Sequence, residues 1–116
     1  MANSTIIYSN KWTYLTLENG FENFGTSDYQ SLSVRRISPT IAELYGVLKR
    51  LSNPSEFTLI AQLPSAFFPK NRLLNYERKI DSNSETGRFD ILTNGRIEYI
   101  FGDTKSHFRV QLLYSL

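Results

Sequence analysis

The feature of this sequence that most constrains its fold is a pair of alternating segments joined by Asn94-Gly95. Polar and apolar side chains alternate in residues 88–91 before this dipeptide, and Ile97, Tyr99 and Phe101 alternate with Arg96 and Glu98 after it. Asn-Gly between two period-two segments is the strongest short-range hairpin signal, because both residues tolerate a positive φ. The sequence therefore predicts a β-hairpin over residues 88–101.

Period-two alternation recurs elsewhere and predicts further strands. Residues 107–114 place Phe108, Val110, Leu112 and Tyr114 on one face of a half-buried terminal strand. Residues 12–17, 31–34, 57–63 and 72–80 are β-like as well, and Gly, Pro and Asn clusters separate these segments at short intervals. Eight Phe and seven Tyr against one Met also favour strands over helices. We expect an all-β chain of about seven to eight short strands, arranged as a small antiparallel β-barrel or sandwich.

Residues 41–51 fit both a helix and a strand. Ile41, Leu44, Tyr45, Leu48 and Leu51 recur at helical spacing, and a capping-box pattern directly follows a proline. A mid-segment glycine costs a helix about 1 kcal/mol. The even-numbered residues 42–48, moreover, form one apolar face of a strand. Local rules leave both interpretations open.

Length and composition set the class of protein. A chain of 116 residues has the size of one domain, so residues 1–116 are expected to form a single unit. The net charge of +2 comes from interspersed charges, which does not suggest nucleic-acid binding. The chain has no cysteine, no apolar segment of membrane-spanning length and no signal-peptide pattern at its start. We expect neither disulfides nor membrane insertion.

The residues of catalytic chemistry form no recognisable constellation. His107 is the only histidine, and without a second histidine or a cysteine it does not make a typical zinc site. No nucleophile turn accompanies Ser106 and His107, and no phosphate-binding glycine loop is present. The sequence predicts no enzyme, no catalytic residues, no metal site and no cofactor. A small glycan hydrolase with paired carboxylates remains the weakest alternative.

A polar and aromatic set near the final hairpin has the residue types of a saccharide site. Sugars are bound by bidentate hydrogen bonds to Asp and Arg and by stacking on aromatic rings. The candidate binding residues are Asp90, Arg88, Tyr99, Arg109 and His107. On composition alone, the charged members are also explained as solvent-facing strand residues, and Tyr99 as a core residue.

Several short motifs occur in an order that resembles one known family. They are KWT (11–13), GFENFG (20–25), VRR (34–36), LYGV (44–47), LPSAFFPKNR (63–72), GRFDI (87–91), TNGRI (93–97) and FG (101–102). In this order they resemble the head domains of receptor-binding and tail-fibre proteins from siphophages of Gram-positive bacteria, the lactococcal type in particular. The resemblance spans nearly the whole chain.

The resemblance carries expectations about fold and site. Heads of this family are homotrimeric β-barrels or sandwiches with Greek-key-like connections, so residues 44–48 are expected to form a strand with a central glycine. Their saccharide pocket implies that Asp90 matches the family's aspartate, and Arg88 stands where the family has His. Tyr99 stands near the family's Trp, and Arg109 is the counterpart of a late Arg. Residues 81–86 form a longer insertion before the hairpin, and residues 1–10 are a stem remnant or an added start.

The resemblance also implies a function. We expect a non-catalytic adhesin of a phage tail tip or baseplate that binds host cell-wall polysaccharide or a teichoic-acid-like polymer. Such a protein is made in the host cytoplasm and resides in the virion, at the distal tail or baseplate, in contact with other tail proteins. The alternative is a structural assembly module of the tail or baseplate that docks another virion protein.

Overall fold

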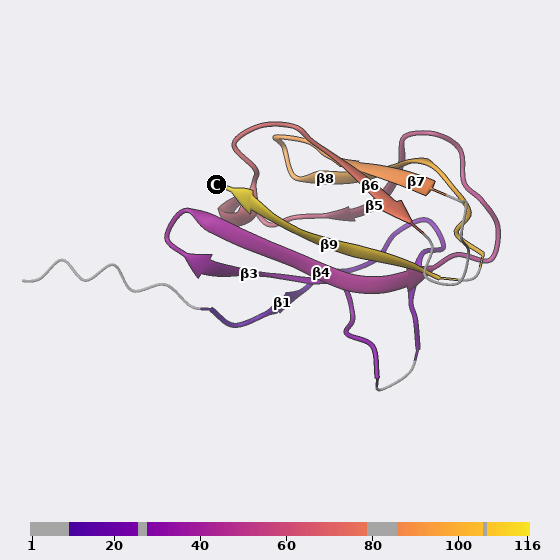
Figure 1. The fold of residues 1–116 in the computed structure, drawn as a ribbon, viewed down its shortest axis with the longest axis horizontal. Helices are drawn as coiled ribbons and strands as arrows, with labels where there is room; N and C mark the ends of the chain where they lie inside the picture. Colours follow the sequence, from indigo (N-terminus) through magenta and orange to yellow (C-terminus); the bar gives the residue numbers. More distant parts are fainter. Residues whose placement is uncertain (1–9, 26–27, 79–85, 106) are drawn as a thin grey trace, which may run out of the picture.

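The computed structural model describes residues 10–25, 28–78, 86–105 and 107–116, and these form two antiparallel β-sheets (Figure 1). The elements are β1 (Thr13–Tyr14), β2 (Glu22–Asn23), β3 (Ser33–Ser38), β4 (Ile41–Lys49), β5 (Thr58–Gln62), the 3-10 turn η1 (Ser65–Phe67), β6 (Leu73–Arg78), β7 (Thr86–Ile91), β8 (Arg96–Phe101) and β9 (Phe108–Ser115). The described residues contain no α-helix, which confirms the all-β prediction. The nine strands in this part of the chain exceed the expected seven to eight, and the two-residue β2 was not predicted.

The two sheets pack face to face and nearly close into a barrel. Sheet A has the order β1-β3-β4-β9, with β2 pairing beside β4 beyond the end of β3. Sheet B has the order β5-β8-β7-β6, in which β5 lies beside β8 as in a Greek key. A bridge between Leu17 and Ala61 joins the sheets on one side, and the Lys70 N–H donates to the Ser115 carbonyl on the other.

The predicted hairpin is confirmed, although its turn has three residues rather than two. The Gly95 N–H donates to the Leu92 carbonyl, and the Leu92 N–H donates to the Arg96 carbonyl. Within this turn only Gly95 has a positive φ, of +84°, as in a type I turn followed by a left-handed residue. A Cβ on Gly95 would lie 2.4 Å from the Phe68 ring, so packing requires glycine here as much as the turn does.

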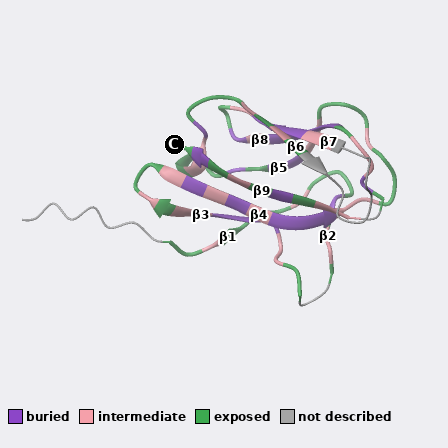
Figure 2. Ribbon diagram, viewed as in Figure 1, coloured by how far each residue is buried: buried purple, intermediate pink, exposed green. Residues whose placement is uncertain are grey.

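Residues 41–49 form the long central strand of sheet A, so the strand expected from the family resemblance is confirmed. Ala42, Leu44, Gly46 and Leu48 are buried, and Figure 2 shows this alternation along β4. A Cβ on Gly46 would lie 2.5 Å from the Leu32 Cα and 2.8 Å from the Leu32 nitrogen. Because glycine has no side chain, the backbone of Leu32 can pack directly against β4 at this position, which explains the glycine in the strand.

The core lies between the sheets and is built from the inward faces of the strands. Its fully buried members include Leu44 and Val110 from sheet A and Ile91 and Ile97 from sheet B. The predicted insertion at residues 81–86 and the proposed stem at residues 1–10 fall almost entirely outside the described residues. In the described part of the chain, no helix is long and apolar enough to span a membrane.

Candidate functional site

The outer face of sheet B carries the charged residues of the hairpin. Along β7, Phe89 and Ile91 point into the core, so Arg88 and Asp90 point outward by the two-residue period of a strand. Across the sheet, Asp90 lies between Leu74 on β6 and Glu98 on β8, and Arg88 pairs with Tyr76 and Phe101. The structure thus brings together Arg88 and Asp90, two of the five predicted binding residues.

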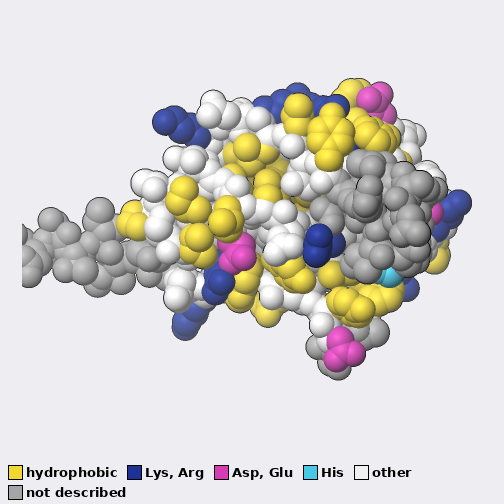
Figure 3. All heavy atoms as spheres, viewed as in Figure 1, with side chains coloured by type: hydrophobic (Ala, Val, Ile, Leu, Met, Phe, Trp, Pro, Cys, Tyr) yellow, Lys and Arg dark blue, Asp and Glu magenta, His cyan; other side chains and the backbone are white. Residues whose placement is uncertain are grey.

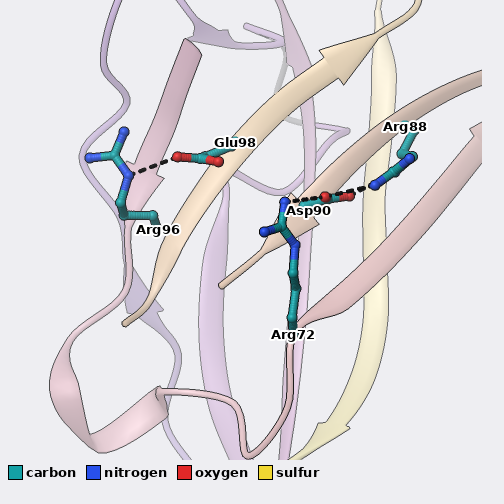
Figure 4. A network of polar contacts seen from close by, with 5 residues as sticks. All are labelled: Arg72, Arg88, Asp90, Arg96 and Glu98. Carbon is teal, nitrogen blue, oxygen red and sulfur yellow. Dashed lines mark hydrogen bonds and ion pairs between the residues drawn. The ribbon is translucent and has the colours of Figure 1, made fainter. Parts of the chain in front are cut away.

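Asp90 is held by two arginines, one on its own strand β7 and one just before β6 (Figure 4). Arg88 donates from Nε to Oδ1 over 2.8 Å and from Nη2 to Oδ2 over 2.9 Å. Arg72, which directly precedes β6, donates from Nη2 to Oδ2 over 2.8 Å. The side chain of Asp90 exposes 0% of its surface, whereas those of Arg88 and Arg72 expose 24% and 49%. The arginines therefore cover the carboxylate and remain accessible themselves.

Electrostatics keep this cluster ionised. Burial raises the pKa of Asp90, but the hydrogen bonds and charges of Arg88 and Arg72 outweigh it and bring the pKa below its ordinary value. The hydrogen bonds to Asp90 raise the pKa of Arg88 in spite of its desolvation. Asp90 is consequently a fixed negative charge that orients two guanidinium groups.

A second ion pair lies on the same sheet face, on the neighbouring strand β8. Glu98 is the cross-strand partner of Asp90, and Arg96 donates from Nε to its Oε2 over 2.8 Å. Like charges directly opposite each other destabilise a sheet. Because each carboxylate has its own arginine partner, β7 and β8 can pair with two acidic residues facing each other (Figure 4).

Exposed apolar side chains flank the arginines. Tyr76 on β6 exposes 59% of its surface and Phe101 at the end of β8 exposes 42%, and their ring centroids lie 6.3 Å apart. The Arg88 guanidinium carbon lies 5.7 Å from the centroid of the Tyr76 ring. Leu74 on β6 is also exposed. Figure 3 shows hydrophobic side chains beside basic ones along the edge where sheet B lies.

Tyr99 does not lie with Arg88 and Asp90. It points into the core from the opposite face of β8, is 7% exposed, and its hydroxyl donates to the Gly102 carbonyl over 2.6 Å. Burial, with the nearby charge of Asp103, raises its pKa despite the hydrogen bond with Gly102. Tyr99 is therefore a core residue, as the alternative interpretation of the sequence expected, and it does not line the outer face of sheet B.

His107 and Arg109 lie with sheet A, away from the hairpin. Arg109 is exposed on β9 and pairs with Val47 of β4. His107 precedes β9, and its ring centroid lies 4.9 Å from that of Phe24. The five predicted residues thus fall into three places: the outer face of sheet B, the core, and the outer side of sheet A.

The sheet B cluster offers hydrogen-bond donors more than acceptors. The carboxylate of Asp90 already accepts three hydrogen bonds and has no exposed surface. Guanidinium groups carry five N–H donors each, more than Asp90 engages, and they bind carboxylate and phosphate oxygens in a planar fork. This surface can therefore bind an acceptor-rich group beside an apolar ring.

Arg72, Tyr76 and Phe101 are site residues that the sequence did not single out. Arg72 closes the LPSAFFPKNR segment, and no local pattern connects it with Asp90. Phe101 continues the alternation of Ile97 and Tyr99, which predicts a core position. The register shift between Arg88 and Phe89 instead leaves Phe101 opposite Arg88 on the outer face.

Comparison with known proteins gives a likeness of fold. No protein-family model and no curated protein sequence matches the chain. Among solved structures, the chain is similar to the receptor-binding protein gp15 of Listeria phage PSA, with a TM-score of 0.67 and 15% sequence identity. The match covers 92% of this chain and 66% of that protein, so the chain spans just under two thirds of its length. The chain has the fold of part of a phage receptor-binding protein.

Proposed function

We propose that this chain is a non-catalytic adhesin domain of a phage tail tip or baseplate, which binds the host cell wall through the outer face of sheet B. The observation that carries this proposal is the pair of partly exposed arginines fixed on the covered carboxylate of Asp90. The fold likeness to a phage receptor-binding protein supports the same assignment. Virion localisation, at the distal tail or baseplate, follows from this role.

The ligand that suits the site is a cell-wall polymer with anionic groups, such as a teichoic-acid-like polymer or an acidic polysaccharide. Arg72 and Arg88 supply the donors for a phosphate or carboxylate. The Tyr76 and Phe101 rings supply a surface for the C–H face of an adjoining sugar. In this arrangement Asp90 positions the arginines, and Tyr99 supports the strand from the core side.

Each such site is shallow, and we expect weak binding per domain. A homotrimer, with many copies in each virion, would raise the overall avidity without new contacts. Measurement of the mass in solution tests the trimer directly.

The test is binding of the labelled chain to Gram-positive cells, comparing wild type with Arg88→Ala. We expect Arg88→Ala to reduce cell binding at least tenfold, because it removes the bidentate partner of Asp90 and its remaining donors. Treatment of the cells with cold hydrofluoric acid, which cleaves phosphodiester polymers, should reduce binding of the wild type as well. Retained binding after this treatment would indicate a carboxylate-bearing polysaccharide instead.

The chain offers a matched control in Arg96→Ala. Arg96 also makes a 2.8 Å ion pair on the outer face of sheet B, but it begins β8, whereas Phe101 ends that strand. Its loss leaves Glu98 unpaired and should cost some stability, but Arg72 and Arg88 remain on Asp90, so cell binding by the folded variant should be unchanged. Equal binding of Arg88→Ala and wild type, with both folded, would refute this site.

A structural module that docks another virion protein is the second candidate function. Sheet A exposes Tyr14, Ile37 and Leu113 on β1, β3 and β9, and exposed large apolar side chains favour a protein contact. Stable co-purification with a tail or baseplate protein, together with no binding to cells or glycan arrays, would favour this function over the adhesin.

The ion pairs of the two facing carboxylates, Asp90 and Glu98, argue against a glycan hydrolase at this site. A glycosidase needs a general acid with a raised pKa, but the pKa of Asp90 is lowered and both Asp90 and Glu98 are held by arginines. Release of reducing ends from cell-wall polysaccharide by the purified chain would be needed to support it.

A further inference from the structure

An aromatic cluster on sheet A is separate from the core and from the arginine site, as we call Arg72, Arg88 and Asp90 on sheet B. Phe24, Tyr29 and His107 form it, and we call it the ring cluster. The Phe24 ring centroid lies 5.0 Å from that of Tyr29, at an interplanar angle of 78°, and 4.9 Å from that of His107, at 42°. None of the three belongs to the hydrophobic cluster between the sheets.

The ring cluster lies on the outer face of sheet A, where β4 is flanked by β2 and β9. The Phe24 N–H donates to the Val47 carbonyl, and His107 precedes Phe108, the partner of Leu48. Val47 alternates with the core-facing Leu48 and is itself 1% exposed, yet it lies outside the core cluster. A buried outward valine shows that side chains pack over this part of the sheet.

Part of the ring cluster remains open to solvent. Tyr29 exposes 41% of its surface, because an edge contact with Phe24 covers only part of a ring. The single His side chain lies beside hydrophobic ones on the visible surface in Figure 3. Covering Val47 explains why Phe24 is apolar. It does not explain why the neighbours of Phe24 are an exposed tyrosine and a histidine.

The charges around the ring cluster balance, unlike those at the arginine site. Asp28 is exposed beside Tyr29, and Arg109 is exposed on β9 at the position two residues after His107. Glu22 and Lys49 form an ion pair of 3.9 Å on β2 and β4. These four side chains, two acidic and two basic, lie next to the cluster residues along the chain or on the strands that flank them, and their charges sum to zero.

We propose that the ring cluster is a second saccharide site, which binds a neutral sugar ring. A pyranose has an apolar C–H face that stacks on an aromatic ring and a rim of hydroxyls that both donate and accept. Tyr29 provides the stacking surface, and the His107 imidazole, Asp28 and Arg109 provide hydrogen-bond partners for the rim. An anionic group gains no net charge attraction here.

This proposal rests on the proposed function, because both take the ligand to be a cell-wall polymer. With a second site, the domain is bivalent. The two sites lie on opposite sheets, so one sugar cannot occupy both. A wall polymer with neutral and anionic parts, or two neighbouring chains, would engage both faces of the domain and gain avidity.

The test is NMR titration of the whole chain with glucose, galactose, N-acetylglucosamine, rhamnose and glycerol phosphate, each as a separate probe. His107 is the only histidine and Trp12 the only tryptophan, so their ring signals are unique reporters of two regions. Trp12 lies under the Arg35 guanidinium on sheet A, 4.4 Å from it, and is the control. We expect at least one neutral sugar to shift the His107 signals saturably and to leave Trp12 unchanged.

Variants separate this proposal from the first. The His107 shift should persist in Arg88→Ala, weaken about three- to tenfold in Tyr29→Ala and return in Tyr29→Phe, which keeps the ring. No shift of His107 with any neutral sugar, equal shifts at Trp12, or loss of the shift in Arg88→Ala would overturn the second site. Failure of the arginine site would be detected in a different experiment, as unchanged cell binding of Arg88→Ala.

Discussion

Replacing Asp90 with Asn is a direct test of the physical reasoning behind the arginine site. The substitution keeps the size of the side chain but removes its charge, so Arg72 and Arg88 face each other without a counter-ion. Asn also presents an NH2 group where one carboxylate oxygen accepted a hydrogen bond. Three charge-assisted hydrogen bonds are weakened or lost.

The size of the effect follows from the exposure of the partners. Hydrogen bonds to charged groups contribute about 1.5–3 kcal/mol each, whereas exposed ion pairs contribute only about 0.2–1 kcal/mol because water screens them. The covered carboxylate approaches the first case, but the Arg72 side chain is 49% exposed and approaches the second. We expect Asp90→Asn to lower the free energy of unfolding by about 2 kcal/mol at pH 7, and the melting temperature by roughly 8 °C.

The pH dependence of this loss identifies the charge as its cause. The folded-state pKa of Asp90 is lowered from an ordinary value of 3.8. Its stabilising contribution is therefore fully present above the unfolded-state pKa and is lost as the pH falls through the folded-state pKa. The difference between wild type and Asp90→Asn should be constant near neutral pH and shrink in acid.

Urea denaturation of both proteins, from pH 7 down to pH 2, measures this difference. Arg96→Ala is the control for a general loss of surface charge, since it removes an ion pair from the same sheet face. A difference between wild type and Asp90→Asn that does not change with pH would refute the assignment of the effect to the ionised carboxylate.

Two further predictions concern the fold that holds the site. Gly46→Ala should lower the free energy of unfolding by about 2–3 kcal/mol in urea denaturation, because the new Cβ would meet the Leu32 backbone at 2.5 Å. Gly25→Ala is the control and should cost less than about 1 kcal/mol, because no atom lies nearer than 4.0 Å to its Cβ. The Tyr114 hydroxyl donates to the Phe67 carbonyl, and burial raises the pKa of Tyr114. Because Tyr114 therefore ionises in the unfolded state first, the stability of the chain should fall as the pH rises above 10. Tyr114→Phe should cost about 1 kcal/mol at pH 7 and flatten this alkaline decline, and an unchanged decline would contradict the role of Tyr114.

The strands that sequence could predict are those whose pattern is local. Polar and apolar side chains alternate strictly in residues 88–91, 96–99 and 107–112, and a two-residue period suffices to separate a core face from an outer face. Arg88 and Asp90 lie on one face for this reason, since residues two apart on one strand share a face. The remaining candidates lay on different strands, where alternation carries no information about distance.

Residues 41–49 show where local pattern is insufficient. Their helical spacing and capping box are real features of the sequence, but the pairing of β4 with β3, β2 and β9 outweighs them. The steric reason for Gly46 is the Leu32 backbone that crosses over it, a contact between segments 14 residues apart. A helix cap contributes about 1 kcal/mol, which is small beside the burial of a whole central strand.

By itself, the sequence determined that the chain is all-β, that residues 88–101 form a hairpin, and that Arg88 and Asp90 share its outer face. Each of these depends on neighbours within a strand or a turn. Only the tertiary structure decided that Arg72 reaches Asp90, that a register shift leaves Phe101 beside Tyr76, and that His107 joins Phe24 on the other sheet. These contacts depend on strand register and sheet packing, which the order of residues along one strand does not specify.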